Sequence, residues 1–187
     1  IKNNKAIGIM LEDGTEVFAD KVISNLNPKL LFKKLVDRDD VNEEYRRKIL
    51  NYKCGSGTFR MNVALSELPD FNCLPGKEIS EHHKSGIVIA PSLTYMDQAF
   101  TDAKQYGWSK NPIVEMLIPS TVDSTLAPEG KHVASLFCQQ FAPTLPDNRS
   151  WHDEKDNAAN TIIETVNRFA PNFKNSILGM SILSPLD

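Results

Sequence analysis

The fold of this chain is decided by the stretch Gly8-Ile9-Met10-Leu11-Glu12-Asp13-Gly14-Thr15-Glu16-Val17-Phe18-Ala19-Asp20-Lys21-Val22-Ile23-Ser24-Asn25. Two short apolar runs flank Asp13-Gly14, and this dipeptide favours a two-residue hairpin turn because both positions tolerate positive φ. The second run leads into a predicted strand, which ends at the Ser-Asn-x-Asn-Pro break over residues 24–28. The stretch therefore predicts a β-hairpin followed by a crossover strand, with a boundary in composition near the break.

Beyond the break, helices and strands follow one another in a non-repeating order. Apolar residues at helical spacing predict helices over residues 28–36, 42–50, 92–106 and 153–170. Alternating or continuous apolar runs predict strands over 55–68, 86–90, 113–119, 132–141 and 177–183, with 132–141 expected to be central. This order favours a mixed β-sheet flanked by helices over a doubly wound parallel sheet, so the predicted fold class is α+β.

The bulk composition excludes several function classes. A hydrophobic content of 41% and a charged content of 24% are ordinary for a soluble globular protein. The net charge of −3 gives no electrostatic reason to expect nucleic acid or an anionic membrane as a partner. No apolar run approaches the roughly 20 residues that span a bilayer, so no transmembrane segment is expected. The oligomeric state cannot be derived from the sequence.

The first residues and the cysteines bear on location. The chain starts at Ile1 without an initiator Met or the apolar core of a signal peptide, which favours a trimmed sequence. Its three cysteines, an odd number, share no metal or redox spacing, which favours a reducing compartment and thiols that act as small hydrophobes. The expected location is the cytoplasm, or the mitochondrial matrix if the source is eukaryotic.

Motifs of self-contained chemistry are absent from the sequence. It has no G-x-G-x-x-G turn, P-loop or G-x-S-x-G elbow. The pair His82-His83 is expected in a solvated loop and no metal site is predicted, because adjacent side chains point apart and no further ligand is spaced beside them. Glu115 and Arg60 each lie within a predicted strand. Each faces either solvent or an internal partner, or else lines a substrate pocket.

The hairpin and several later segments resemble FAD-dependent oxidoreductases of the phytoene desaturase and amine oxidase superfamily. Within it the sequence is similar to the pyridine nucleotide-disulphide oxidoreductase domain-containing protein 2 type. The segments that carry the resemblance are residues 8–28, 56–65, 85–92, 112–120, 126–132, 139–143 and 182–187. They cover essentially the whole chain and are specific as a set, although no single one is diagnostic.

The resemblance implies that the chain is the central fragment of a longer flavoenzyme. Residues 1–27 would be the C-terminal edge of a flavin-domain segment, and residues 28–187 a substrate-binding domain, incomplete at its C-terminal end. The parent would bind FAD and oxidise a small apolar organic substrate by removing a hydride equivalent. This fragment would shape the pocket over the flavin, with the missing FAD-binding domain of the same chain as its partner. It would be inactive by itself and is not expected to hold FAD.

The resemblance also implies which residues lie nearest the flavin, namely Ser24, Asn25, Asn27 and Pro28. The family pattern V-S-N-A-D-P has Leu26-Asn27 here in place of Ala-Asp. The role near the flavin is therefore assigned to these residues from their position in the pattern, and not from identical side chains. A strand end closed by an Asx-type turn explains the same residues equally well. No catalytic base is identified.

Two other classes of function stay open on the sequence alone. The chain could be a stand-alone module that binds an apolar ligand such as an isoprenoid or lipid, or an interaction scaffold whose cavity is filled. Flanking coding sequence separates the flavoenzyme fragment from both.

Overall fold

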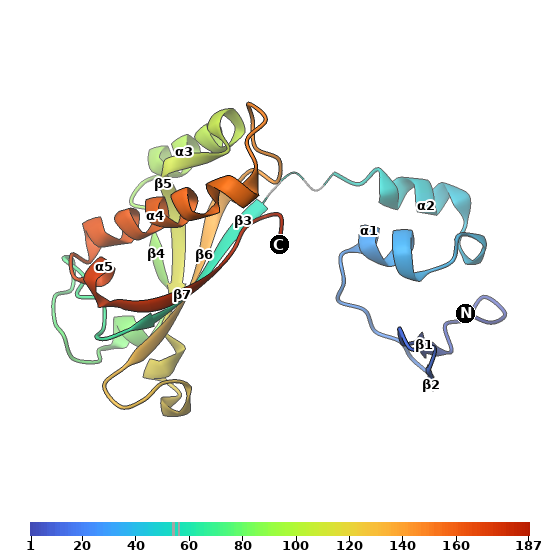
Figure 1. Ribbon diagram of the computed structural model, residues 1–187, viewed down its shortest axis with the longest axis horizontal. Helices are drawn as coiled ribbons and strands as arrows, with labels where there is room; N and C mark the ends of the chain where they lie inside the picture. The colour runs from blue at the N-terminus through green and yellow to red at the C-terminus, as the bar shows by residue number, and fades with distance from the viewer. Residues whose placement is uncertain (54, 56) are drawn as a thin grey trace. The chain divides into compact units, whose positions relative to one another are not determined.

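The computed structural model describes residues 1–53, 55 and 57–187, and divides into two compact units, Ile1–Cys54 and Gly55–Asp187 (Figure 1). Cys54, one of the thiols considered above, and Ser56, within a predicted strand, lie outside the described residues. This division falls at a different point from the boundary predicted after Asn27. That boundary concerns the domains of the parent and stays a prediction.

In the first unit, the predicted hairpin forms from β1 (Gly8–Met10) and β2 (Glu16–Phe18), with Ile9 opposite Val17. Its turn is longer than the predicted two residues, because the Leu11 amide donates to the Thr15 carbonyl and encloses residues 12–14. Only Gly14 of this turn takes a positive φ, of 84°. The Asp13 carboxylate instead accepts a bond from the Thr15 amide at 2.9 Å, so a three-residue loop replaces the two-residue turn.

The helices of this unit are short. Helix α1 (Pro28–Leu30) continues as a π-helical turn over Leu31–Leu35 and is capped by the side chain of Asn27. A 3₁₀ turn (Arg38–Asp40) precedes α2 (Glu43–Leu50), which Asn42 caps as predicted. No strand forms over residues 19–26. A crossover strand needs a neighbouring strand to satisfy its backbone, and the described chain offers none there; within the parent it stays a prediction.

The described residues of the second unit form the five-stranded sheet and three α-helices. In chain order its elements are β3 (Gly57–Leu65), β4 (Ile87–Ile89), α3 (Leu93–Tyr106), β5 (Trp108–Leu117), β6 (His132–Phe141), α4 (Trp151–Phe169), α5 (Phe173–Ser176) and β7 (Ile177–Leu183). Single 3₁₀ turns lie at Glu81–Lys84, Pro119–Thr121 and Ser124–Leu126. Helix α4 starts at Trp151, earlier than the predicted Asp153, because the Ser150 hydroxyl caps the His152 amide.

The five strands pair in the order β4-β5-β6-β3-β7, with β6 central as predicted. The α+β class is confirmed. Every described pairing is antiparallel, however, so the sheet is not mixed as expected. Parallel neighbours would need a crossover connection between adjacent strands. The connection from β6 through α4 to β7 does join strands that run in the same direction, but β3 lies between them and is antiparallel to both. Figure 1 shows α4 lying across the sheet.

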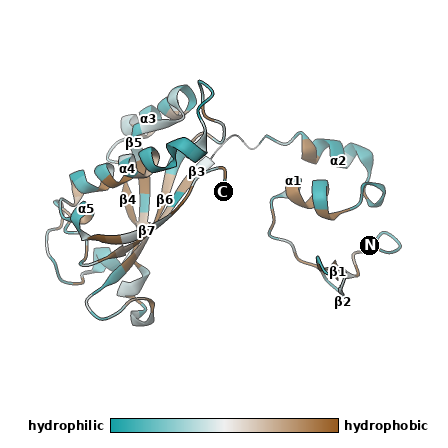
Figure 2. Cartoon of the chain, viewed as in Figure 1, coloured by the Kyte–Doolittle hydropathy of each residue, from teal (hydrophilic) through white to brown (hydrophobic). Residues whose placement is uncertain are grey.

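One face of the sheet and the inner stripe of α4 form the core. Phe59, Met61 and Leu65 of β3 are completely buried, and Ala158, Ile162 and Val166 face them from α4. The rings of Phe59, Phe141 and Trp151 cluster at one end, with centroids 5.3–6.2 Å apart. Figure 2 shows hydrophobic residues concentrated in the strands and hydrophilic residues along much of α4. The apolar side of α4 and the inward-facing residues of the strands therefore pack together in one core.

Candidate functional site

The candidate site is the side of the sheet that α4 does not cover, here called the open face. Along β3, buried residues alternate with exposed ones, which places Arg60, Asn62 and Ala64 on this side. Strand register extends the open face across the sheet. Its other members are Val88 of β4, Glu115 and Leu117 of β5, Val133, Ser135, Phe137 and Gln139 of β6, and Ser181 and Leu183 of β7, all exposed or half-buried. The sheet therefore has one face packed against α4 and one face that is accessible except at Ile113, which stands opposite Gln139 and is buried.

A single row of opposed residues crosses all five strands of the open face. It runs Val88–Glu115–Phe137–Arg60–Leu183, each residue standing directly opposite the next. The Phe137 ring, 38% exposed, lies between the two residues that the sequence singled out, Arg60 and Glu115. Directly opposed residues on one face of antiparallel strands are near neighbours. The structure thus brings Arg60 and Glu115 onto one surface, separated by one aromatic side chain.

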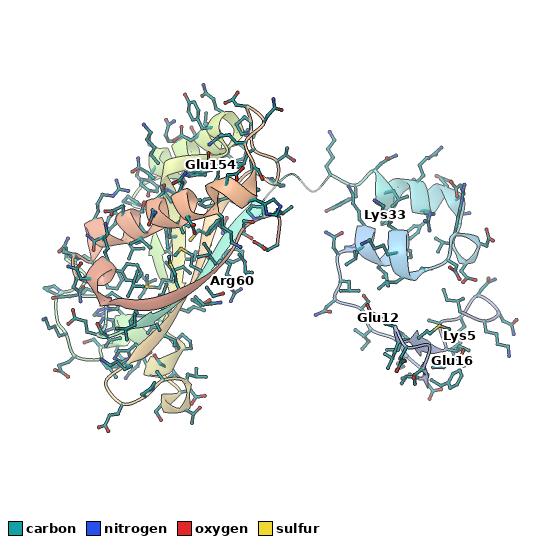
Figure 3. The ribbon with its side chains drawn as sticks, in the orientation of Figure 1. Lys5, Glu12, Glu16, Lys33, Arg60 and Glu154 are labelled. Carbon is teal, nitrogen blue, oxygen red and sulfur yellow. The ribbon has the colours of Figure 1, made fainter. Side chains whose placement is uncertain are left out.

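Each of these two charges is held by a neutral neighbour. Arg60 Nη2 donates to the Ser135 hydroxyl at 3.1 Å (Figure 3 labels Arg60 on β3). The Glu115 carboxylate accepts from Gln139 Nε2 at 2.6 Å. Two strand spacings, about 10 Å, separate the strands of Arg60 and Glu115. Among the described residues the two form no ion pair with each other, so both charges stay available to a ligand.

Sequence reasoning missed Phe137, Ser135 and Gln139 as members of this face. They lie in a segment whose sequence predicts a buried central strand, because Leu136, Phe137 and Cys138 are consecutive apolar residues. Only the pairing of Phe137 with Arg60 and Glu115 assigns its side. The neighbouring Cys138 is buried in the core, and burial, followed by the Glu115 charge, raises the pKa of its thiol. Cys138 is therefore a packing residue, whereas Cys73 is exposed.

The four residues predicted near a flavin, Ser24, Asn25, Asn27 and Pro28, are all exposed. The side-chain oxygen Oδ1 of Asn27 accepts from the Lys29 amide at 2.9 Å, and the Ser24 hydroxyl accepts from the Leu26 amide at 3.3 Å. Pro28 occupies the first position of α1. These two bonds form the local turn, with a side chain bonded to the backbone two residues on, that the sequence predicts as the alternative to a role at the flavin. The role of these residues at a flavin stays a prediction.

The expectation of a solvated loop at His82-His83 is wrong for His83, which is completely buried. Its Nδ1 accepts from the Ser80 amide at 3.2 Å, and its Nε2 lies 3.0 Å from the Pro69 carbonyl. The two imidazole rings lie in contact, with centroids 3.9 Å apart and planes inclined by 42°. The 3₁₀ turn Glu81–Lys84 brings the adjacent side chains together, which neither a helix nor a strand would do. Within the described residues, no group of His, Cys, Asp or Glu is arranged to hold a metal ion.

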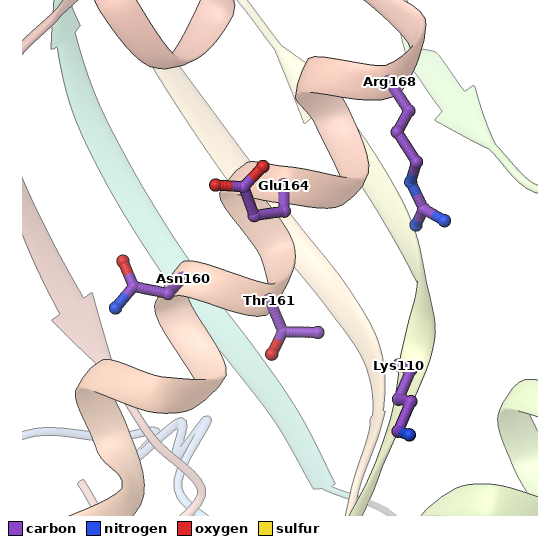
Figure 4. Close-up of a pocket in the computed structure, with 5 residues that line it drawn as sticks. All are labelled: Lys110, Asn160, Thr161, Glu164 and Arg168. Atoms are coloured by element: carbon purple, nitrogen blue, oxygen red, sulfur yellow. The ribbon is translucent and has the colours of Figure 1, made fainter.

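A shallow depression of about 450 Å³ lies between α4 and β5 (Figure 4). Its lining residues are Lys110, Asn160, Thr161, Glu164 and Arg168. Arg168 donates to Asn111 at 2.6 Å, and Glu164 is paired with Lys174 at 2.5 Å. Because these charges already serve the fold, we assign no function to the depression. No helix of the described residues has the length and apolar character to cross a membrane.

Comparison with known proteins connects this fold to oxidoreductases. The chain is 35% identical over 185 residues, 96% of its length, to pyridine nucleotide-disulfide oxidoreductase domain-containing protein 2 of Rattus norvegicus. It is 25% identical over 191 residues to the chloroplastic prolycopene isomerase of Daucus carota. A crystal structure of an oxidoreductase from Methanosarcina mazei matches 98% of the chain with a TM-score of 0.55 at 18% identity, a likeness of fold. No protein-family model matches.

The chain is thus a relative of one segment of oxidoreductases. It spans about a third of the curated relatives that it matches, 32% of the rat protein and 28% of the carrot protein. Its resemblance to the pyridine nucleotide-disulphide oxidoreductase domain-containing protein 2 type is confirmed, and the match extends through both compact units.

Proposed function

We propose that this chain provides the substrate-binding part of an FAD-dependent, phytoene dehydrogenase-like oxidoreductase. Its open face would form the wall of a pocket over the flavin, with Arg60 and Glu115 among the pocket residues. The observation that carries the proposal is the asymmetry of the sheet. One face is packed to completion, while the other presents both apolar and hydrogen-bonding side chains. Ligand sites combine an apolar lining with a few placed polar groups in this way.

The first unit supports the proposal from a different direction. None of its described residues 1–53 is buried, although it carries exposed Met10, Phe18 and Ile23. An isolated two-stranded hairpin is at best marginally stable, so this unit requires further protein to cover it. In the proposed parent, residues 1–27 would be the edge of the flavin domain, and the rest of that domain would cover them.

We do not expect the residues of this chain to hold a flavin by themselves. Of the four candidates, Ser24 and Asn27 already bond the local backbone, and no buried donor or acceptor surrounds them among the described residues. Most contacts to FAD would therefore come from outside residues 1–187, with Asn25 and the backbone of residues 24–28 at the rim. When bound, the flavin would supply the hydride acceptor. The chain's own part would be to bind and orient an apolar organic substrate.

The proposal is tested by the parent gene and protein. Coding sequence upstream should encode a strand followed by G-x-G-x-x-G, and the purified full-length protein should be yellow with the visible spectrum of an oxidised flavin. A full-length protein without that motif and without bound flavin would overturn the proposal. The stand-alone apolar-ligand module would then be the better explanation of the open face.

A further inference from the structure

Arg60 is a cation at an interior position of the open face, and no acidic side chain among the described residues forms an ion pair with it. Of its five N–H donors, the structure pairs one nitrogen with the Ser135 hydroxyl. Among the described members of the open face, the other ionised side chain is Glu115, and Phe137 stands between the two. The guanidinium fork matches a carboxylate in a bidentate manner, more closely than a lysine would. Among the described residues, the other N–H groups of the Arg60 guanidinium are therefore free to bind a carboxylate.

The immediate neighbours of Arg60 across the sheet are apolar. Phe137 lies directly opposite on β6, and Leu183, 46% exposed, lies directly opposite on β7. A cation between two apolar side chains suits a molecule with an anionic end and an apolar body. The body would cover Phe137 and remove its apolar area from water. The head would form charge-assisted hydrogen bonds with Arg60, which are stronger than those between neutral groups.

Glu115 limits the charge of such a ligand. It lies beyond Phe137 in the same row, and Gln139 holds its carboxylate in place. A second anionic group carried past Phe137 would meet a like charge, which is destabilising. The row therefore favours one acidic end and disfavours a molecule with acids at both ends.

We propose that the open face recognises an amphipathic substrate with a single carboxylate, which Arg60 binds, and an apolar body that lies over Phe137 and extends toward Glu115. This inference rests on the proposed function, because it takes the open face as the substrate pocket and names the class of substrate. Arg60 is a specificity-determining residue in this assignment, and Glu115 excludes dicarboxylates.

The test uses the full-length parent protein and the fluorescence of cis-parinaric acid, a long-chain polyene carboxylic acid. Its methyl ester, which has the same body without the charge, is the matched probe. The acid should bind more tightly than the ester. Arg60→Gln should weaken binding of the acid by about tenfold or more and leave the ester unchanged, as expected for loss of a charged hydrogen bond. Arg60→Lys should restore part of the preference. Lys110→Gln, which removes a cation of β5 outside the open face, is the control.

Equal affinities of the wild-type protein for acid and ester would overturn the inference. So would an Arg60→Gln variant that loses thermal stability but keeps its preference for the acid, because Arg60 would then pair with another part of the parent. Failure of the proposed function has a different signature, since a parent without bound flavin is recognised by its absorbance before any probe is added. The preference for the acid is measured independently by fluorescence.

Discussion

The two units differ in how far they bury their apolar side chains. In the unit of residues 55–187, Phe59 and Phe141 are at most 1% exposed, whereas in the unit of residues 1–54 Phe18 is 69% and Ile23 is 94% exposed. Both units contain strands, helices and capping residues of ordinary chemistry. They differ in whether the apolar side of each element finds a second layer. The sheet of the larger unit has α4 against it, while the β1–β2 hairpin has no such cover among the described residues. Local structure therefore does not ensure a core.

The most demanding test of this difference is a matched pair of phenylalanine truncations in the 187-residue chain. Phe59→Ala removes a ring packed against Phe141 and Trp151, and should lower the free energy of unfolding by about 3–5 kcal/mol. Phe18→Ala should change it by less than about 0.5 kcal/mol, because an exposed ring loses little packing. Urea unfolding monitored by far-ultraviolet circular dichroism, to which the backbone of both units contributes, measures both values. Equal losses would show that Phe18 packs in solution and would remove the contrast between the units.

A pair of asparagines sharpens the comparison with a smaller effect. The Asn172 side chain accepts from the Asp70 amide at 2.8 Å and donates to the Leu68 carbonyl at 2.9 Å, so it ties the segment after β3 to α5. Asn172→Ala should lower the unfolding free energy by about 1–3 kcal/mol.

Its counterpart in the first unit is Asn42, whose side chain caps α2 through the amides of Glu44 and Tyr45. Asn42→Ala should cost about 1 kcal/mol locally, visible as faster amide exchange in α2. The urea midpoint of the larger unit should stay where it is. A shift of that midpoint by Asn42→Ala as large as that by Asn172→Ala would contradict the prediction.

The smallest expected effect is a pH dependence confined to the larger unit. Burial, followed by the proximity of His83, lowers the pKa of both His82 and His132 in the folded state. Below about pH 6.5 the unfolded chain then binds more protons than the folded one, so stability falls as the pH drops through this region. Urea midpoints between about pH 7 and about pH 5 should show this loss. The double variant His82→Gln, His132→Gln should reduce it, and His152→Gln, at an exposed site, should not.

Local sequence signals predicted most elements of the larger unit. The strands at 132–141 and 177–183 have the predicted bounds, and Ser92 and Gly107 delimit α3 as expected from their capping chemistry. Gly107 has a φ of 95°, which most other residues would adopt only at a cost. The predictions failed where the structure of a segment depends on a residue far away in the sequence. Residues 19–26 form no strand because no strand within the described part of the chain pairs with them, and His83 is held in the interior by Pro69, fourteen positions earlier, which accepts its ring N–H.

The candidate site divides in the same way. The sequence identified Arg60 and Glu115 as charges within strands and left open which side each faces. Whether they share a surface depends on the pairing of β3 and β5 with β6, and the contact between Arg60 and Ser135 joins residues 75 positions apart. Period-two alternation fixes which residues of one strand lie together, but not the register against another strand.

The sequence by itself determined the α+β class, the positions of the main helices and strands, and the kinship with oxidoreductases, because periodicity, capping residues and motifs are local properties of the chain. The tertiary structure alone decided that the sheet is antiparallel, that Phe137 stands between Arg60 and Glu115, and that one face is closed by α4 while the other stays accessible. These outcomes depend on which surfaces bury one another, and that free energy is shared among residues far apart in the sequence.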